Sequence, residues 1–224
     1  QGVTVAPQPG GGAESLPSAI VERIVASVRD NFDAAYGGFG DAPKFPHPDA
    51  IDLALRDYQR HGSQASLNVA TATLDRMVAG GIYDRIEGGF FRYSTTRDWR
   101  IPHFEKMLEG NAGLLGNYLR AYQVTGEARY AAAARDIMRY VDSVLSDQDQ
   151  GGFYGSQDAD EAYYALPLSE RRSRPAPAVD TTLYTDWNAM MASAYLLASA
   201  LLNDERPRRF ALRTLDRLWK VAFV

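Results

Sequence analysis

Residues that can transfer protons or bind a polar ligand gather in four short stretches of this 224-residue chain. The densest stretch, residues 82–108, reads IYDRIEGGFFRYSTTRDWRIPHFEKML. Aromatic rings beside carboxylates and an arginine are typical of carbohydrate binding, because sugar C–H faces lie on rings while fixed polar groups recognise the hydroxyls. The substrate-binding residues expected here are Tyr83, Asp84, Arg92, Tyr93, Trp99, Glu105 and Lys106.

His103 is the first candidate for proton transfer, because an imidazole titrates near neutral pH. It follows Pro102, immediately before a helix expected over residues 104–124. A helix N-terminus there would favour the neutral ring. The alternative is that His103 only caps this helix, whose first turn contains Glu105 and Lys106.

Asp158 and Asp160 are the other two catalytic candidates. They lie in DQDQGGFYGSQDADE, residues 147–161, and share one face if the chain is extended. Two carboxylates facing a sugar can serve as acid and base. The alternative is a solvated acidic loop. The match of this stretch to a calcium loop is weak, because position 12 is Asp and position 5 is Gly, so no metal site is predicted.

Two further stretches supply binding candidates. Lys44, in the rigid loop GGFGDAPKFPHP (residues 37–48), is expected to pair with a carboxylate or bind a sugar hydroxyl, unless this loop only caps the end of the fold. Trp187 and Asn188, in TDWN, are expected to face either the ligand or a neighbouring helix. The preceding Thr185 or Asp186 is a natural helix N-cap.

Composition excludes several classes of protein. With 24 basic and 28 acidic residues the net charge is −4, which argues against a nucleic-acid partner. The chain has no cysteine, so a disulfide framework and a thiol nucleophile are excluded within it. The longest apolar run, residues 189–202, is shorter than the roughly 20 residues that a membrane span needs. We expect a cytoplasmic protein without a cofactor.

Helical periodicity dominates the chain, and short strands are expected only at 90–94 and 153–156. Start and stop signals such as Pro48, Gly62 and Gly126 delimit the helices. Seven helices are expected, at about residues 18–32, 48–62, 66–79, 104–124, 127–145, 186–202 and 205–224.

The tripeptide Gly-Gly-Phe recurs at residues 37–39, 88–90 and 151–153. Two predicted helices lie between successive copies, so the repeating unit is a helical hairpin with this loop at one end. Long hairpin loops collected at one end are typical of an all-α fold, the α/α-toroid, in which inner helices ring a funnel and loops build a site at its mouth. An open helical solenoid is the alternative.

The domain organisation expected is a linker at residues 1–15, rich in Gly and Pro, followed by a toroid domain over residues 16–224. Seven helices make about three and a half hairpins, whereas six hairpins would need roughly 330 residues at this spacing. We therefore expect a partial toroid. Its open side would expose apolar helix faces, so a homodimer or low stability is also expected.

Five motifs in this order resemble the spermatogenesis-associated, thioredoxin-domain-containing protein family: GGFGDAPKFP, GGIYDRIEGGFFRYS, WRIPHFEKMLEGNAGLL, GGFYGSQDADE and TDWNAMMASA. They cover most of residues 30–200. The resemblance implies a six-hairpin glycosidase-like toroid, related to N-acylglucosamine 2-epimerases, that follows a thioredoxin-like domain. It implies no catalytic role for any single residue.

Two functions follow from the residues and the resemblance. The first is binding and processing of a carbohydrate-like small molecule in the funnel, by hydrolysis or epimerisation. Asp158 or Asp160 would be the acid or base and His103 a second proton carrier. The second is a non-catalytic domain that binds a ligand or client for the thioredoxin-like domain. The third hypothesis is a purely structural scaffold.

Overall fold

The computed structural model describes residues 18–222, and the linker expected at 1–15 lies outside the described residues. Seven long helices occur close to the expected ranges, together with two one-turn helices. In the described part of the chain the helices are α1 Ser18–Asp30, α2 Pro48–His61, α3 Gln64–Ala79, α4 Leu108–Thr125, α5 Ala128–Val144, α6 Glu161–Tyr164, α7 Leu168–Arg171, α8 Thr185–Leu202 and α9 Glu205–Ala222.

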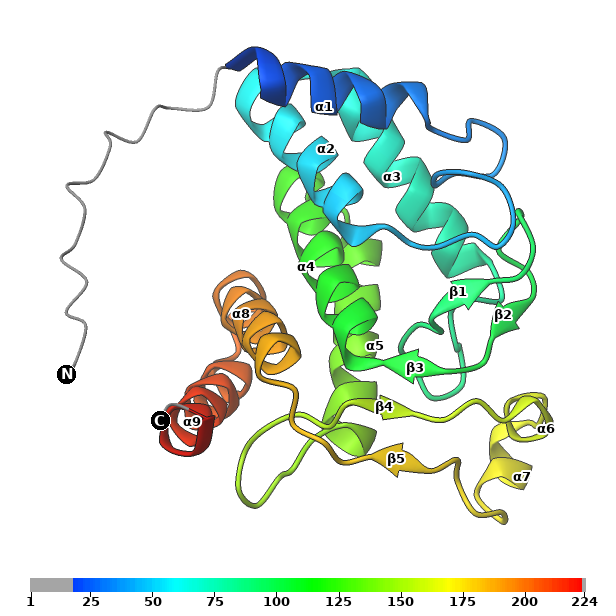
Figure 1. The fold of residues 1–224 in the computed structure, drawn as a ribbon, viewed down its shortest axis with the longest axis vertical. Helices are drawn as coiled ribbons and strands as arrows, with labels where there is room; N and C mark the ends of the chain where they lie inside the picture. The colour runs from blue at the N-terminus through cyan, green and yellow to red at the C-terminus, as the bar shows by residue number, and fades with distance from the viewer. Residues whose placement is uncertain (1–17, 223–224) are drawn as a thin grey trace, which may run out of the picture.

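The long helices form three antiparallel hairpins, α2–α3, α4–α5 and α8–α9, preceded by α1 (Figure 1). Helix α4 packs against both α2 and α8, whereas α3, α5 and α9 each pack behind their own partner. Helices α2, α4 and α8 are therefore the inner layer of an arc, and α3, α5 and α9 are the outer layer. The all-α toroid architecture expected from the repeat is confirmed.

Local sequence explains where these helices begin and end. Pro48 occupies the first position of α2, where its missing N–H costs nothing, and Gly62 ends the helix with φ 69°. Gly126 ends α4 in the same way, with φ 73°. Helix α8 is apolar on almost all sides because α4 and α9 cover it from two directions.

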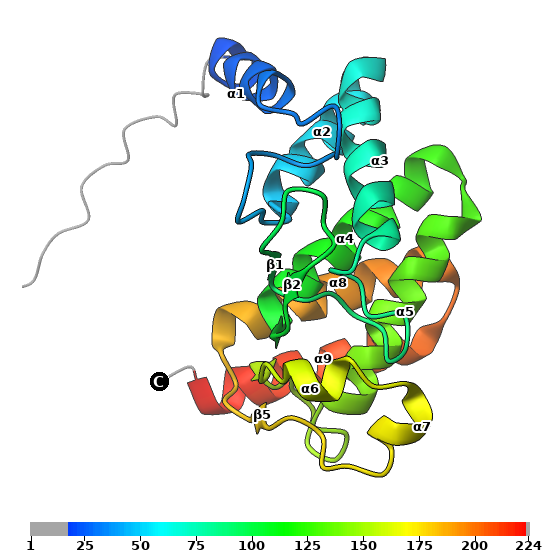
Figure 2. The ribbon, with the colours of Figure 1, turned by 90° about the vertical axis from the view of Figure 1, so that its right-hand side faces the viewer.

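Five two-residue strands join the hairpin loops into one layer on one side of the helices (Figures 1 and 2). They are β1 Tyr93–Ser94, β2 Pro102–His103, β3 Lys106–Met107, β4 Ser156–Gln157 and β5 Val179–Asp180. Antiparallel pairing of β3 with β4 links the second loop to the third, and a bridge between Lys44 and Ser94 links the first to the second. This loop layer covers the N-terminal ends of the inner helices.

One expectation about this layer is wrong. The fourth long helix begins at Leu108, not at residue 104, because Lys106 pairs with Gln157 and the Leu108 N–H donates to the Gly155 carbonyl. Strand pairing thus replaces the first helical turn. Residues 162–180 are mostly exposed and include α7 and β5, but the side chain of Arg171 in this segment is buried.

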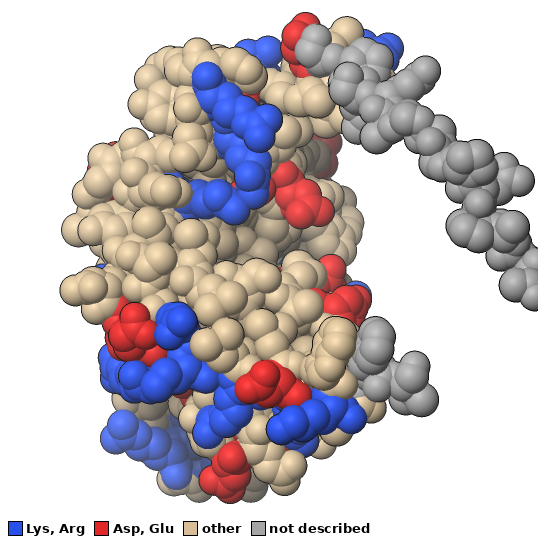
Figure 3. All heavy atoms as spheres, turned by 90° about the vertical axis from the view of Figure 1, so that its left-hand side faces the viewer, with Lys and Arg blue, Asp and Glu red and all other residues tan. Residues whose placement is uncertain are grey.

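The face opposite the loop layer carries a short basic stripe and a separate zone where basic and acidic side chains alternate, with uncharged surface between them (Figure 3). The charges on this face are therefore mixed, in keeping with a net charge of −4. Over the described residues, each helix is too short or too polar to cross a membrane.

Candidate functional site

Each Gly-Gly-Phe copy forms the same turn, built by backbone hydrogen bonds. An aspartate stands four residues before the first glycine in all three copies, at Asp33, Asp84 and Asp147. Its N–H donates to the carbonyl of the second glycine, and the first glycine N–H donates back to its carbonyl, at 2.7–3.1 Å. All six glycines have φ between 70° and 108°, a region that side chains with a Cβ rarely adopt.

The three aspartates also anchor the loop layer through ion pairs. Each carboxylate accepts hydrogen bonds from N–H groups of its own turn and pairs with a cation from a distant segment. The nearest N–O separations are 2.5 Å for Lys44–Asp33, 2.7 Å for Lys106–Asp84 and 2.8 Å for Arg217–Asp147. Lys44 and Lys106 thus do pair with carboxylates, inside the loop layer.

The second copy has the most elaborate network. Lys106 is fully buried, donates to the Gly88 carbonyl at 2.8 Å and lies 4.2 Å from the Tyr140 ring centroid. Arg171 Nη1 reaches the same Asp84 oxygen as Lys106, at 3.0 Å. Burial lowers the pKa of Lys106 to about 8, against the attraction of Asp84, which raises it. Burial raises the pKa of Asp84, but the charge and hydrogen bond of Lys106, the Ile86 N–H and the charge of Arg171 together outweigh burial and hold this pKa below its usual value.

Two asparagines on the inner helices fix the Phe of a loop from both sides. Asn111 Oδ1 accepts the Phe90 N–H at 2.8 Å, and its Nδ2 donates to the Phe90 carbonyl at 3.0 Å. Asn188 makes the same two bonds to Phe153, at 2.7 and 2.8 Å. Asn188 was expected to face either the ligand or a neighbouring helix, but it is buried and faces its own loop instead.

Three aromatic candidates are also held inside the protein or against a neighbour. Trp99 is completely buried and donates its indole N–H to the Tyr36 carbonyl at 3.0 Å. Tyr83 is buried and its hydroxyl donates to Asp136, and burial together with this bond raises its pKa. Trp187 is half-buried against Tyr184, with ring centroids 4.3 Å apart.

The remaining candidates of the densest stretch, residues 82–108, lie together at the rim of the loop layer. The Tyr93 ring stacks between Phe45 and His103, at centroid distances of 4.8 and 5.0 Å. Glu105 Oε2 accepts a hydrogen bond from Arg92 at 3.0 Å and lies 3.6 Å from His103 Nε2. The rim thus combines two exposed or half-exposed aromatic faces with a cation, a carboxylate and an imidazole.

A cavity of about 510 Å³ opens beside this rim, between the N-terminal ends of α2 and α4, and we call it the mouth cavity. Its lining joins aromatic side chains to charged ones and includes Phe45, His47, Asp49, Phe91, Arg92 and Glu109. His47 has φ 49°, an unusual conformation for a residue with a Cβ, and such outliers cluster at functional sites. The size and lining match those of a small-molecule site.

Asp158 and Asp160 lie apart from this lining. Both are exposed. Asp158 directly follows β4, and its N–H donates to the Ala178 carbonyl. The Asp160 side chain caps α6, because its Oδ1 accepts the Tyr163 N–H at 2.9 Å. The Thr185 or Asp186 cap is not formed, because Thr185 is the first helical residue and the N-cap is Tyr184.

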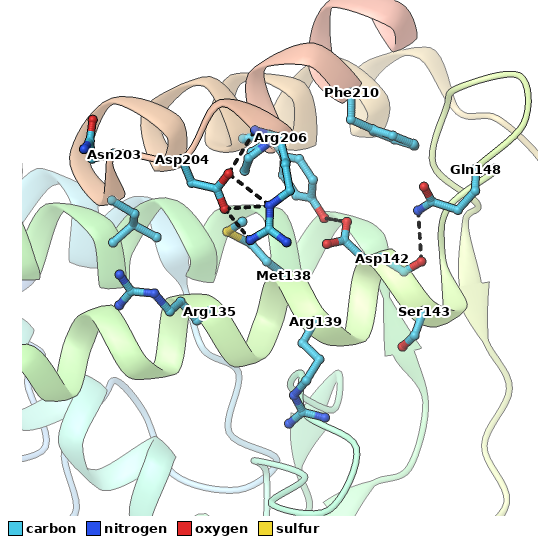
Figure 4. Close-up of a pocket in the computed structure, with 13 residues that line it drawn as sticks. Arg135, Met138, Arg139, Asp142, Ser143, Gln148, Asn203, Asp204, Arg206 and Phe210 are labelled. Atoms are coloured by element: carbon cyan, nitrogen blue, oxygen red, sulfur yellow. Dashed lines mark hydrogen bonds and ion pairs between the residues drawn. The ribbon is translucent and has the colours of Figure 1, made fainter.

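A larger groove of about 850 Å³ lies on the outer wall, between α5 and the α8–α9 turn (Figure 4). Two pairs of its polar groups bond to each other. Arg206 binds Asp204 through both carboxylate oxygens, and the Tyr195 hydroxyl donates to Asp142 at 2.8 Å. The groove contains none of the predicted site residues, so the mouth cavity is the stronger candidate.

Two repeated acidic positions in the sequence were not recognised above as parts of the site or of its loops. The aspartate four residues before each Gly-Gly-Phe was visible as a repeat, and so was an acidic residue at the second position of each inner helix: Asp49, Glu109 and Asp186. All three side chains are exposed. No group of three or more acidic or histidine side chains in the described part of the chain is placed to hold a metal ion.

An arc of α/α hairpins with the candidate site at the loop end of its inner helices defines the α/α-toroid class. Solved structures agree. Cellobiose 2-epimerase from Spirochaeta thermophila superposes with a TM-score of 0.70 and 19% identity, over 91% of this chain and 54% of that one. A family 76 glycoside hydrolase (mannosidase) from Bacteroides thetaiotaomicron gives 0.65 and 15%, over 81% and 45%. At these identities the likeness shows the fold alone.

The sequence defines the family within this class. Residues 51–174, more than half of the chain, match the model of the N-acylglucosamine 2-epimerase family, and the chain belongs to it. Spermatogenesis-associated protein 20 of Mus musculus is 39% identical over 188 residues, which confirms the resemblance found in the motifs. The match covers 75% of this chain and about a quarter (24%) of that relative's length.

Proposed function

We propose that this chain binds a neutral carbohydrate in the mouth cavity and transfers protons to or from it. The observation that carries the proposal is that cavity itself. Its lining includes two exposed carboxylates, Asp49 and Glu109, on neighbouring inner helices, together with aromatic side chains and Arg92. Membership of an epimerase family, and the names of the solved toroids, support a sugar as ligand.

The position of the two carboxylates suits acid–base chemistry. Each lies in the first turn of an inner helix with its side chain exposed, so each can exchange a proton with a ligand in the cavity. His103 does not line the cavity, but it remains the proposed second proton carrier because its neighbours Tyr93 and Glu105 contact the lining residues Phe45 and Arg92. Asp158 and Asp160 remain proposals of lower rank, since neither lines the cavity.

The experiment separates the two reactions and the two carboxylates. The chain is incubated in D₂O with N-acetylglucosamine, mannose and cellobiose. Deuterium entering C2 of the sugar indicates epimerisation, and new reducing ends indicate hydrolysis. We expect Asp49→Asn or Glu109→Gln to reduce turnover by about 10²–10⁴-fold while binding persists. Asp186→Asn, the matched position on α8, should leave turnover unchanged. Turnover that survives both cavity substitutions contradicts the proposed base.

One observation favours a second function, a non-catalytic domain that binds a ligand or client for a thioredoxin-like domain. Lys44, Asp84 and Lys106 stand in the most distinctive motifs, yet their charged groups are buried in ion pairs. Those motifs are therefore accounted for by loop architecture. Sugar binding without exchange or hydrolysis would support this function. A cytoplasmic location and a homodimer remain predictions from the sequence.

A further inference from the structure

A second cavity continues from the mouth cavity along the inner helices, and we call it the floor pocket. It has a volume of about 380 Å³ and shares Pro48, Asp49, Gly113 and Met190 with the mouth cavity. Its other lining residues lie farther from the loop layer on α2, α4 and α8. A ligand seated in the mouth cavity can therefore extend into the floor pocket.

The floor pocket contains an unsatisfied hydrogen-bond acceptor. Asn117 lines it with only 2% of its surface exposed. Its Nδ2 donates to the Pro48 carbonyl at 3.1 Å, which fixes the orientation of the amide. Its Oδ1 has no partner, alone among the buried side-chain nitrogen and oxygen atoms of residues 18–222. Buried polar atoms are almost always paired, so this oxygen indicates a missing donor.

The charges around Asn117 indicate which donor fits. Arg120 Nε binds Asp52 at 2.6 Å, and Arg56 Nε binds the other oxygen of Asp52 at 2.6 Å. With Asp49 at the boundary with the mouth cavity, two cations and two carboxylates leave no net charge around the pocket. A site without net charge suits a neutral ligand. A neutral hydroxyl can donate to Asn117 Oδ1, and further N–H groups of Arg120 can bind its neighbours.

Glycines on α4 give the ligand room. Gly110, Gly113 and Gly116 follow at intervals of three, so they lie on one face of the helix. Gly110 lines the mouth cavity, Gly116 the floor pocket, and Gly113 both. A Cβ at Gly110 or Gly116 would meet no atom within 4 Å. These two positions are therefore open toward the cavities.

We propose that the floor pocket is a subsite for a second, neutral sugar ring, one of whose hydroxyls donates to Asn117 Oδ1. The ligand is then at least a disaccharide, with one ring in each cavity. This inference rests on the proposed function, since the first ring occupies the mouth cavity.

The open glycines allow each cavity to be blocked separately. Binding of glucose and cellobiose, mannose and mannobiose, and N-acetylglucosamine and its β-1,4-linked dimer is measured by calorimetric titration. We expect at least one disaccharide to bind the unmodified chain roughly tenfold more tightly than its monosaccharide. Gly116→Leu should abolish that preference and leave the monosaccharide affinity unchanged. Gly110→Leu should abolish binding of both sugars.

A second variant tests the acceptor itself. Asn117→Leu should also remove the preference for the disaccharide, and Asn68→Leu, at an exposed asparagine on α3, should retain it. Cooperative melting is required of every variant. A preference that survives both Gly116→Leu and Asn117→Leu, or no preference at all, overturns the floor subsite while monosaccharide binding upholds the proposed function. If no sugar binds the unmodified chain, both fail.

Discussion

Substituting Lys106 by Met tests whether the buried ion pairs hold the loop layer together. The substitution preserves a long apolar side chain but removes the ammonium that lies 2.7 Å from Asp84 and 2.8 Å from the Gly88 carbonyl. Arg171, at 3.0 Å, is then the remaining cation paired with Asp84. The Gly88 carbonyl is left without this donor.

The expected loss follows from what the substitution leaves behind. Removing one partner of a buried ion pair costs about 3–5 kcal/mol, mainly because the remaining charge is uncompensated. Arg171 compensates part of the Asp84 charge, so the lower end applies, and the unpaired carbonyl adds about 1 kcal/mol. We therefore expect the free energy of unfolding to fall by about 3–4 kcal/mol. For a chain of this size that corresponds to a melting temperature roughly 6–16 °C lower.

The assay is thermal and urea unfolding, followed by circular dichroism at pH 7. Lys220→Met is the matched control, since Lys220 is exposed on α9, and it should change stability by less than about 0.5 kcal/mol. Asp84→Asn keeps an oxygen for the Ile86 N–H, which Asp84 Oδ1 accepts at 3.0 Å. The double variant should lose about 1–3 kcal/mol less than the sum of the single variants.

A Lys106→Met chain that melts within about 2 °C of the unmodified chain would contradict the expected loss. Additive losses in the double variant would also contradict it, because additivity means that the two charges do not interact across the pair. In either case the buried pair would be dispensable for the loop layer.

Three further outcomes are expected. Asn111→Ala should lower the free energy of unfolding by about 2–4 kcal/mol in urea titrations, because it leaves the buried N–H and carbonyl of Phe90 unpaired. Asn68→Ala, at an exposed asparagine, is its control. Equal losses in the two variants would contradict a stabilising role for the Asn111 bonds to Phe90. Gly116→Ala should stabilise the chain by about 0.5–1 kcal/mol, because alanine favours the helix and its Cβ meets no atom within 4 Å. Gly113→Ala should destabilise the chain, because its Cβ would lie 2.7 Å from the Pro48 ring. The reverse order of melting temperatures would be inconsistent with the cavity geometry. The Gln150 N–H and the Arg217 guanidinium hold the pKa of Asp147 below its ordinary 3.8, so near that pH the folded chain binds fewer protons than the unfolded chain and stability falls as the pH drops. Asp147→Asn should therefore reduce the dependence of the melting temperature on pH between pH 5 and 3. An unchanged dependence would argue against the lowered pKa.

The architecture was predictable because it follows from local sequence signals. Helix periodicity, the Pro48 and Gly62 boundaries and the spacing of the Gly-Gly-Phe copies are all properties of short segments. The start of α4 was not, since residues 106–107 are held extended by pairing with β4, some 50 residues farther along the chain. Tertiary pairing overrode the local helix signal there.

The site was harder to predict because the partners of its charged residues are far away in sequence. Lys106 looks like a surface residue of a helical turn, and only the fold brings it to Asp84, 22 residues earlier, and to Tyr140. Asp49 and Glu109, which line the mouth cavity, look like ordinary acidic residues of a first helical turn. Lys44, Asp84 and Lys106 thus proved to be buried, whereas the exposed Glu109, although it lies in one of the five motifs, was not among the predicted site residues.

A repeat also constrains where a single site can form. If the three hairpins were identical, the junctions between neighbouring inner helices would offer equivalent cavities. The first copy departs from the others at two points: Ile51 stands where the second and third copies have the clamping Asn111 and Asn188, and His47 adopts φ 49° just before α2. Both departures belong to the helix that borders the mouth cavity, and His47 itself lines that cavity. The α2–α4 junction is therefore where chemistry not shared by the other copies is expected, which favours the mouth cavity as the site on grounds independent of its volume and charge.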